Sequence, residues 1–452
     1  MARTIFTASL ILPVAAALLV GCPSNNGTDP PADGFFFPIA AAQSADGDTL
    51  FVANSDFDLR YNGGTVVSVD LALVRARAAE VARSGPQNCT ADPNAAGAAI
   101  CPAREFIRAR HTRKINPFAV DLAVARYPER ERVYVVVRGD GSLTWLDATP
   151  GGGLDCGGPA EPASPCDDAH RAGVDTAQSP VGARLPPDPS SLSVDPQRGW
   201  VVVSHQSVDP NFARASLFRD PAFTAGAGGA AGPTLLNVVG GLAPGLSSLA
   251  LLGRSADDPT RSTWVSTSRS EASLTFLQAY PGNPQLGDAL PFLYRSATAR
   301  VEGLSTGANN RNVLLDPARP GRAYLISRAP ESMLTVQFDP AAPTRVQVVD
   351  AVPLPPGPSR LAFVPGARPM VLAVSYDARQ VTLVDLGAQR VVGQVFTNRG
   401  PHTVVVDPRG PWAYVLDFLD AAVEVIDLRP EVDGAANRSY LRRVLTLGST
   451  GP

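Results

Sequence analysis

The hydrophobic positions of residues 400–428 fall into three short runs that are separated by polar turns. The runs are rich in β-branched residues, which fit a pleated strand better than a helix. Gly-Pro and Asp-Pro-Arg-Gly sequences bound the first run and are typical of turns. The pattern therefore predicts three strands and tight turns, followed by a fourth strand over Tyr440–Leu447. The three predicted strands are Thr403–Val406, Ala413–Leu416 and Ala422–Asp427.

Degenerate copies of this module recur back to residue 38. The residues that close the second strand of each copy are Ser55, Arg138, His205, Ser268, Arg328, Tyr376 and Phe418. The last spacings match the ~40–50 residues of a four-stranded propeller blade, and the longer early ones indicate insertions. Such a sheet cannot bury both faces alone, so the blades must stack around an axis. The predicted fold is all-β, a seven-bladed β-propeller of four-stranded antiparallel blades over residues 35–452.

Residues 1–22 have the pattern of a secretory signal peptide. Arg3 precedes an apolar core, residues 10–20, that is too short for a transmembrane helix. The Leu-Val-Gly-Cys sequence that ends at Cys22 resembles the bacterial lipobox, which implies a lipid-modified Cys22 as the mature N-terminus. An ordinary signal peptide with an incidental cysteine is the alternative. Residues 23–34 are polar and proline-rich, and predict a flexible tether.

This signal predicts a lipid-anchored protein of the cell envelope. Pro23 stands where an aspartate commonly marks inner-membrane retention in lipoproteins, so the outer membrane is favoured. The formal net charge is −3, which gives no reason to expect a nucleic-acid partner.

Four cysteines besides Cys22 lie in two pairs that are close in sequence, Cys89 with Cys101 and Cys156 with Cys166. Local pairing is the simplest of the three possible disulfide connectivities, and an oxidising compartment permits it. The nearby histidines lack the spacing of zinc ligands, so no metal site is predicted.

Three insertions are expected between the third and fourth strands of the first three blades: Leu73–Ala103, Thr149–Ala177 and Pro221–Pro233. The first begins with helical composition, which Gly85 ends. All three are expected on one face of the disc, as surface loops or, alternatively, as a docking edge for a partner.

The opposite face collects the starts of the innermost strands and the ends of the second strands, which together form the mouth of the propeller. The starts include Phe118, Ser190, Ser191, Arg311, Asn312, Arg360 and His402, and the ends include Arg138, His205, Arg269, Arg328, Tyr376 and Phe418. An arginine ring would attract a carboxylate, a phosphate or an acidic peptide. The alternative is that these arginines only reach water. The predicted partner-binding residues are Arg138, His205, Arg311, Arg328, Arg360, Tyr376 and His402.

Catalytic chemistry has no sequence motif to support it. His205 and His402 lack a local partner motif, and no haem, zinc or phosphate-loop signature is present, so neither a cofactor nor a metal is predicted. Alternating oxygen donors in residues 54–62 could hold Ca²⁺, but they lack the glycine and terminal glutamate of a calcium loop and indicate a plain loop. The sequence therefore predicts a protein that is not an enzyme.

The segments LFVANSDFD, RVYVVVRGDGSLTWLD and WAYVLDFLDAAVEVIDL resemble the YVTN-repeat propellers, in divergent form, across residues 36–447. Val52-Ala53-Asn54 keeps the Val-x-Asn element most closely. The resemblance implies a seven-bladed propeller in a secreted or surface protein, and it implies no reaction.

Two functions follow as hypotheses. The first is an envelope lipoprotein whose propeller face binds a protein, peptide or glycan partner without catalysis. The alternative is a channel-mouth enzyme or redox-partner propeller, lactonase-like or quinoprotein-like, and the arginines at the mouth favour the first hypothesis.

Overall fold

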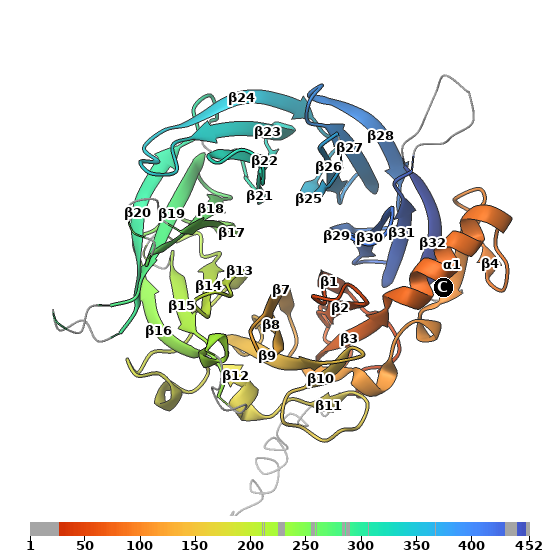
Figure 1. Cartoon of the computed structure of the whole chain (residues 1–452), viewed down its shortest axis with the longest axis horizontal. Helices are drawn as coiled ribbons and strands as arrows, with labels where there is room; N and C mark the ends of the chain where they lie inside the picture. Colours follow the sequence, from red (N-terminus) through yellow and green to blue (C-terminus); the bar gives the residue numbers. More distant parts are fainter. Residues whose placement is uncertain are drawn as a thin grey trace, which may run out of the picture.

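The computed structural model describes residues 27–448, apart from positions 210, 212, 225–230, 255–257, 259, 283–284, 286–289, 306, 367 and 430–440. The described residues form seven β-sheets, or blades, in a ring around a central axis (Figure 1). The first strand of each blade lies nearest the axis. The predicted seven-bladed β-propeller is therefore confirmed.

Four antiparallel strands form the body of each blade. Blade 1 contains β1 (Pro38–Gln43), β2 (Thr49–Asn54), β3 (Gly64–Asp70) and β6 (Arg113–Ile115). Blade 2 contains β7 (Ala119–Arg126), β8 (Glu131–Val137), β9 (Ser142–Thr149) and β10 (Gly153–Asp155). Blade 3 contains β13 (Pro189–Asp195), β14 (Trp200–His205), β15 (Ala215–Arg219) and β16 (Thr234–Val239). Blade 4 contains β17 (Leu246–Arg254), β18 (Ser262–Ser268), β19 (Ser273–Tyr280) and β20 (Phe292–Arg300).

The last three blades have the same order. Blade 5 contains β21 (Asn312–Leu315), β22 (Arg322–Arg328), β23 (Glu331–Phe338) and β24 (Val346–Pro353). Blade 6 contains β25 (Pro358–Val364), β26 (Met370–Ser375), β27 (Gln380–Asp385) and β28 (Arg390–Phe396). Blade 7 contains β29 (Pro401–Val406), β30 (Trp412–Asp417), β31 (Ala422–Asp427) and β32 (Arg442–Gly448). The short strands β11 (Ser164–Pro165) and β12 (Arg171–Ala172) pair with β6 and β9.

The hydrophobic core is a set of layers between neighbouring blades. One cluster joins Phe51 and Val66 of blade 1 to Val133 and Val135 of blade 2. The second strands are buried on both faces, as in β14 and β30, where every residue is buried. This explains the continuous apolar runs of these strands, because each blade is covered by the next.

The four-stranded body of blade 1 comes from residues before 116 and that of blade 7 from residues after 400, and the ring is closed where strands of the first blade's insertion join the sheet of blade 7. Residues 71–112 are inserted between β3 and β6 and are called here the clasp; their helix and strands lie along the outer edge of blade 7 (Figure 1). The clasp contains α1 (Leu71–Ser84), β4 (Thr90–Ala91) and β5 (Ala99–Pro102), and β5 pairs in parallel with β32. The predicted helical stretch is confirmed, and it ends at Gly85.

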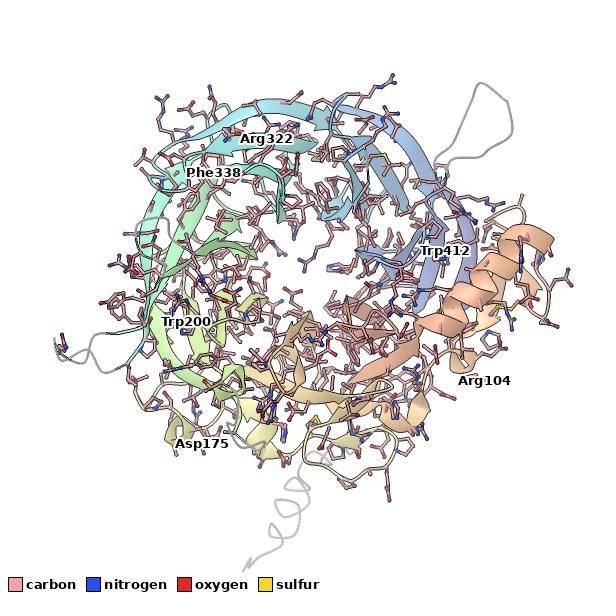
Figure 2. The ribbon with its side chains drawn as sticks, viewed as in Figure 1. Arg104, Asp175, Trp200, Arg322, Phe338 and Trp412 are labelled. Carbon is pink, nitrogen blue, oxygen red and sulfur yellow. A yellow bond between two sulfur atoms is a disulfide. The ribbon has the colours of Figure 1, made fainter. Side chains whose placement is uncertain are left out.

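The clasp is held to blade 7 by an apolar layer and by buried ion pairs. Trp412 belongs to the same hydrophobic cluster as the buried face of α1 (Figure 2). Arg443 of β32 is almost fully buried and contacts Asp92 of the clasp at 2.8 Å and Glu424 of β31 at 2.6 Å. Arg75 of α1 contacts the buried Asp407 of blade 7 at 2.7 Å. Together with the pairing of β5 and β32, these contacts join the first and last blades.

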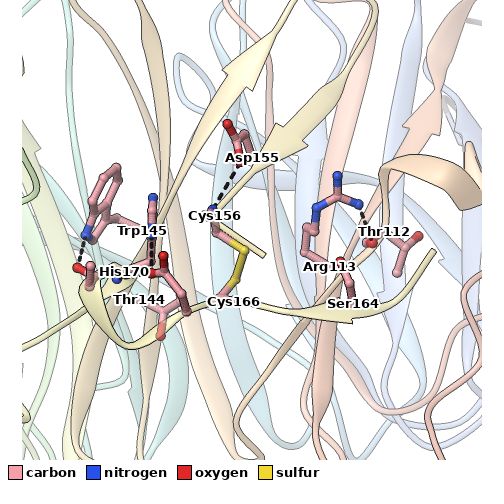
Figure 3. The surroundings of a disulfide bond; sticks show 12 residues. Thr112, Arg113, Thr144, Trp145, Asp155, Cys156, Ser164, Cys166 and His170 are labelled. Atoms are coloured by element: carbon pink, nitrogen blue, oxygen red, sulfur yellow. Dashed lines mark hydrogen bonds and ion pairs between the residues drawn. A yellow bond between two sulfur atoms is a disulfide. The ribbon is translucent and has the colours of Figure 1, made fainter. Parts of the chain in front are cut away.

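The predicted disulfide pairing is confirmed. Cys89–Cys101 lies within the clasp, and Cys156–Cys166 closes a loop beside blade 2 (Figure 3). In the same region the ring of His170 lies 3.8 Å from that of Trp145, centroid to centroid. Short 3-10 turns occupy Ala103–Glu105, Ala109–His111, Asp168–His170, Thr176–Gln178 and Pro221–Phe223.

Residues 1–26, with the predicted signal peptide, Cys22 and the first part of the tether, lie outside the described residues. The last part of the predicted tether contacts blade 1, where Asp29 forms an ion pair with Lys114 at 2.9 Å and the Ala32 carbonyl accepts a hydrogen bond from Thr112. Within the described part of the chain, none of the helices has the length and apolar character needed to cross a membrane.

The last residue of the second strand anchors the loop that leads into its own blade. Ser268 donates to the Pro244 carbonyl at 2.6 Å, and Ser375 donates to the Pro355 carbonyl at 3.1 Å. Asp417 has the same register position in blade 7, opposite the residue that starts the first strand. It is fully buried, with the side chain of Asn398 as a polar neighbour, and neither carboxylate oxygen has a hydrogen bond of good geometry among the described residues. Burial, followed by the nearby charge of Glu424, raises the pKa of Asp417 well above its ordinary value.

Replacing Asp417 with asparagine is expected to raise the free energy of unfolding by about 1–3 kcal/mol at pH 8 and to change it little at pH 4. A carboxyl whose pKa is raised by folding contributes its full stability below its ordinary pKa, and that stability is lost as the pH rises. Besides Glu424, the charged groups that act on Asp417 are Asp420, which raises its pKa, and Arg443, which lowers it.

Urea denaturation at the two pH values measures this difference. Asp33→Asn, at an exposed carboxylate, is the matched control and should have no effect at either pH. A wild-type protein that is more stable than D417N at pH 8 would contradict the assignment.

Candidate functional site

A cavity of about 480 Å³ lies on the propeller axis, at the face where the first strands begin. Figure 2 shows side chains of the inner strands that project towards this axis. One residue from the start of the first strand of every blade lines it: Ile39, Val120, Ser190, Ser247, Arg311, Ser359 and His402. A second group follows the second strands or ends them: Ser55, Arg138, Gln206, Arg269, Arg328 and Phe418.

A β-bulge aims the first group into the cavity. In the described chain, six first strands shift register at this position, as between Pro358 and Arg360 in β25 or between Pro401 and Thr403 in β29. The extra residue of a bulge is left out of the ladder and its side chain is re-aimed. Arg311 directly precedes β21 and has the corresponding place in blade 5.

Hydrogen bonds between neighbouring blades hold this ring of residues in place. Ser190 donates to the Leu246 carbonyl at 2.9 Å, and Ser247 donates to the Asn310 carbonyl at 2.7 Å. At the closure of the ring, Nδ1 of His402 donates to the carbonyl of Ile39 at 3.0 Å. Because a carbonyl can only accept, this bond places the proton of His402 on Nδ1 and leaves Nε2 as an acceptor at the cavity.

His402 is neutral at physiological pH. Burial, and then the positive charges of Arg360, Arg269 and Arg328, lower the pKa of His402 to about 3. An anion in the cavity would offset the repulsion from these arginines, so its binding would raise the pKa of His402 and make the imidazole a better base.

Two of the arginines at the cavity have no partner. Neither Arg269 nor Arg311 forms a side-chain hydrogen bond or a close ion pair with any described residue, and their Nε atoms are buried. Burial, followed by repulsion from Arg311 and Arg328, lowers the pKa of Arg269 to about 9. Burial, followed by repulsion from Arg328, lowers the pKa of Arg311 to about 10. Such a pair of partly buried cations favours an anionic ligand.

The other arginines have partners within the protein. Arg328 donates only to backbone carbonyls, those of Pro358 at 2.8 Å and Gly357 at 3.1 Å. Arg360 reaches across the axis from blade 6 to Asp121 of blade 2, at 3.3 Å. Arg138 pairs with Asp188 at 2.6 Å near the rim.

Most of the residues predicted at the mouth line this cavity. Arg138, Arg311, Arg328, Arg360 and His402 do so. Tyr376 is half-buried and lies outside the lining residues.

The placement of His205 at the mouth has to be corrected. Its side chain is fully buried, with Nδ1 hydrogen-bonded to the Pro187 carbonyl at 3.0 Å and Nε2 to the Ser216 hydroxyl at 2.8 Å. Successive side chains of a strand point to opposite faces, so an error of one residue at the strand end moves the side chain from cavity to core. Gln206 occupies the position that was assigned to His205.

The sequence reasoning missed several lining residues, including Phe57, Ile39, Val120, Ser247 and Ser359. A proline at the start of a first strand is a usable signal, because the residue after it lines the cavity. This rule identifies Ile39 and Ser359 in the same way as His402. Polar side chains of residues 54–62, which were predicted to form a plain loop, bond to nearby residues of blade 1. Asp56 accepts a hydrogen bond from the Tyr61 backbone at 3.1 Å, and the Asn54 amide donates to the Thr65 hydroxyl at 2.8 Å.

No protein-family model matches the chain, and no curated protein matches its sequence. Solved structures do share its fold. A periplasmic gluconolactonase of Pseudomonas aeruginosa has a TM-score of 0.53 at 15% identity, with 82% of this chain and 89% of that one covered. A putative 6-phosphogluconolactonase of Bacteroides fragilis has a TM-score of 0.50 at 10% identity, with 80% and 85% covered. Hydrazine synthase of Kuenenia stuttgartiensis has a TM-score of 0.52 at 13% identity, with 92% and 99% covered.

These similarities establish the propeller fold, and two of the similar structures are named as lactonases. Membership of the YVTN-repeat family is not shown, because no protein-family model matches. The prediction that this protein is not an enzyme is wrong, because it took a missing sequence motif as evidence against catalysis. Propellers assemble a site from residues of separate blades, so no contiguous motif is required, and the three similar structures carry enzyme names.

Proposed function

We propose that this protein is a hydrolase of small anionic lactones or related esters, which bind in the axial cavity. The observation that carries the proposal is the pair of partly buried, unpartnered guanidinium groups of Arg269 and Arg311 beside the neutral imidazole of His402. The lactonase names of two structures with this fold support hydrolysis over simple binding. A cavity of this volume suits a small molecule, and a macromolecular partner stays a prediction.

The residues at the cavity fit the chemistry of ester hydrolysis. The oxygen of a water molecule bonds to the carbonyl carbon, the ring C–O bond breaks, and the hydroxy acid that forms releases one proton at neutral pH. Guanidinium groups would stabilise the negative charge that develops on the carbonyl oxygen. Nε2 of His402 would accept the proton of the attacking water, assisted by the rise in its pKa when an anion binds.

The proposal includes a location at the cell envelope. It is supported by the signal pattern that ends at Cys22 and by the periplasmic location in the name of the Pseudomonas aeruginosa protein. Lipid attachment at Cys22 and residence in the outer membrane belong to the same proposal.

The proposal is tested by the proton release of lactone hydrolysis in a pH-stat, with glucono-δ-lactone, 6-phosphogluconolactone and the neutral δ-valerolactone as substrates. We expect 6-phosphogluconolactone, the anionic member of this panel, to be hydrolysed faster than its spontaneous rate. Arg311→Gln is expected to lower this rate by about 100-fold or more, because a charged donor at the oxyanion is lost.

Arg319→Gln is the control, since Arg319 is an exposed arginine in the turn that follows β21. It is expected to leave the rate unchanged. Rates no higher than the spontaneous ones across the panel, or an R311Q variant as active as wild type, would overturn the proposal.

A further inference from the structure

The axial cavity has two chemically unlike walls. Arg269, Arg311, Arg328 and Arg360 come from blades 4, 5 and 6. The opposite side, from blades 7, 1 and 2, carries Phe57, Phe118 and Phe418, called here the aromatic wall, beside His402 and Arg138, whose charge is paired with Asp188. Because blades 4 to 6 face blades 7, 1 and 2 across the ring, a ligand in the cavity would touch both walls (Figure 1).

The rings of the aromatic wall form one connected group. The centroid of Phe57 lies 5.6 Å from that of Phe418 and 6.1 Å from that of Phe118, with edge-to-face geometry in both pairs. Phe37 extends the group behind Phe418, at 5.1 Å. Phe57 is nevertheless 59% exposed. Single exposed apolar residues are ordinary, but an exposed ring within an aromatic cluster at the mouth of a cavity is typical of a binding surface.

The backbone of this wall is strained. Phe37 and Phe118 have φ angles of 48° and 62°, in the left-handed region that bulky side chains rarely adopt. The residues directly before the first strands of blades 3, 4, 6 and 7 also have positive φ, so this conformation belongs to the turn that enters the blades, and here it places bulky phenylalanines in that turn.

The polar groups of the cavity floor offer little to a sugar. The hydroxyls of Ser190, Ser247 and Ser359 donate their protons to backbone carbonyls of the neighbouring blade. They are therefore not free to donate to the hydroxyls of a polyol. Besides the amide of Gln206 and the hydroxyl of Ser55, which also line the cavity, the strongest interactions it offers are charge on one side and aromatic surface on the other.

We infer that the substrate of this site is an amphipathic anion: a lactone or ester whose anionic group lies at the arginines and whose apolar ring or chain packs on Phe57, Phe118 and Phe418. The inference rests on the proposed function and narrows its substrate class. It excludes a polyhydroxylated sugar lactone as the preferred substrate, although structures with this fold carry gluconolactonase names. Aromatic side chains provide a large apolar contact area, so a flat apolar group of the ligand would pack favourably on this wall.

Isothermal titration calorimetry with two carboxylates that cannot be hydrolysed tests this inference without measuring turnover. The probes are 3-phenylpropionate and gluconate, with the uncharged 3-phenylpropanol as a third ligand. We expect 3-phenylpropionate to bind at least about tenfold more tightly than gluconate and than 3-phenylpropanol. Phe57→Ser is expected to weaken 3-phenylpropionate binding about tenfold and to leave gluconate binding unchanged.

Phe396→Ser is the matched control, because Phe396 is 72% exposed on β28, the outermost strand of blade 6. It is expected to change neither affinity. Gluconate binding as tight as that of 3-phenylpropionate, or an equal effect of F57S on both ligands, would overturn the inference. Selective binding of 3-phenylpropionate without hydrolysis of any lactone would instead refute the proposed function and leave the ligand class standing.

Discussion

Replacing Arg443 with methionine is expected to lower the free energy of unfolding by about 3–5 kcal/mol at pH 8, because it leaves buried carboxylates without their counter-charge. The guanidinium of Arg443 lies between Asp92 of the clasp and Glu424 of β31, at 2.8 and 2.6 Å. All three side chains are almost fully buried. The change would therefore weaken the join between the clasp and blade 7, which closes the ring.

The loss is expected to be smaller at pH 5. Burial raises the pKa of Glu424 to about 7, although Arg443 opposes this shift. A carboxyl with a raised pKa contributes its full stability below its ordinary pKa of 4.5, and that stability is lost as the pH rises through 7. Removing Arg443 raises the pKa of Glu424 further, so the variant is penalised most where Glu424 would have to ionise.

Chemical denaturation at pH 5 and pH 8 measures both effects, and Arg442→Met is the matched control. Arg442 neighbours Arg443 on β32 but is only half-buried, and its two long contacts, with Asp427 at 3.5 Å and with the Ala82 carbonyl of the clasp at 3.5 Å, are worth about 1 kcal/mol or less. Equal losses for R443M and R442M would contradict the role of the clasp in closing the ring.

Replacing Arg269 with glutamine is expected to make the unliganded protein more stable, by about 1 kcal/mol, and to abolish its response to anions. The guanidinium has no hydrogen-bond or ion-pair partner among the described residues, and repulsion from Arg311, Arg328, Arg360 and Arg138 adds to the cost of its burial. The burial of Arg269 and its repulsion from the other arginines destabilise the empty site. An anion in the cavity would offset this repulsion.

Thermal unfolding with and without phosphate measures both the stability of the unliganded protein and its gain in stability from an anion. A ligand present at 100 times its dissociation constant stabilises the folded state by about 2.7 kcal/mol, so wild type should gain a clear rise in Tm. The R269Q variant should start from a higher Tm and gain little from phosphate. Arg319→Gln, at an exposed position, should behave like wild type. A variant that is less stable than wild type and still responds to phosphate would contradict this account of the arginines.

Much of the fold could be predicted because the signal is local and repeated. Short β-branched runs with Asp-Pro or Gly-containing turns recur in every blade, and stacking follows from the two apolar faces of the second strands. The clasp could not be predicted, since the parallel pairing of β5 with β32 joins residues more than 300 positions apart. Nothing in the local pattern of either strand indicates that pairing.

The cavity could be predicted at the level of strand ends and not at the level of side-chain direction. Arg311, Arg360 and His402 were found because they start first strands, and the chain brings all strand starts to one face. His205 was misplaced by one residue, which in a strand reverses the direction of the side chain. Of the aromatic wall, Phe118 and Phe418 could be placed at the mouth from the strand ends, and Phe57 was missed because it lies in a loop whose sequence carries no periodic signal.

The most direct test is a crystal structure of the mature chain with 3-phenylpropionate bound. The account predicts the carboxylate within hydrogen-bonding distance of Arg269 and Arg311, with the ring against Phe57 and Phe418. A ligand bound elsewhere on the protein, with the axial cavity empty, would contradict it.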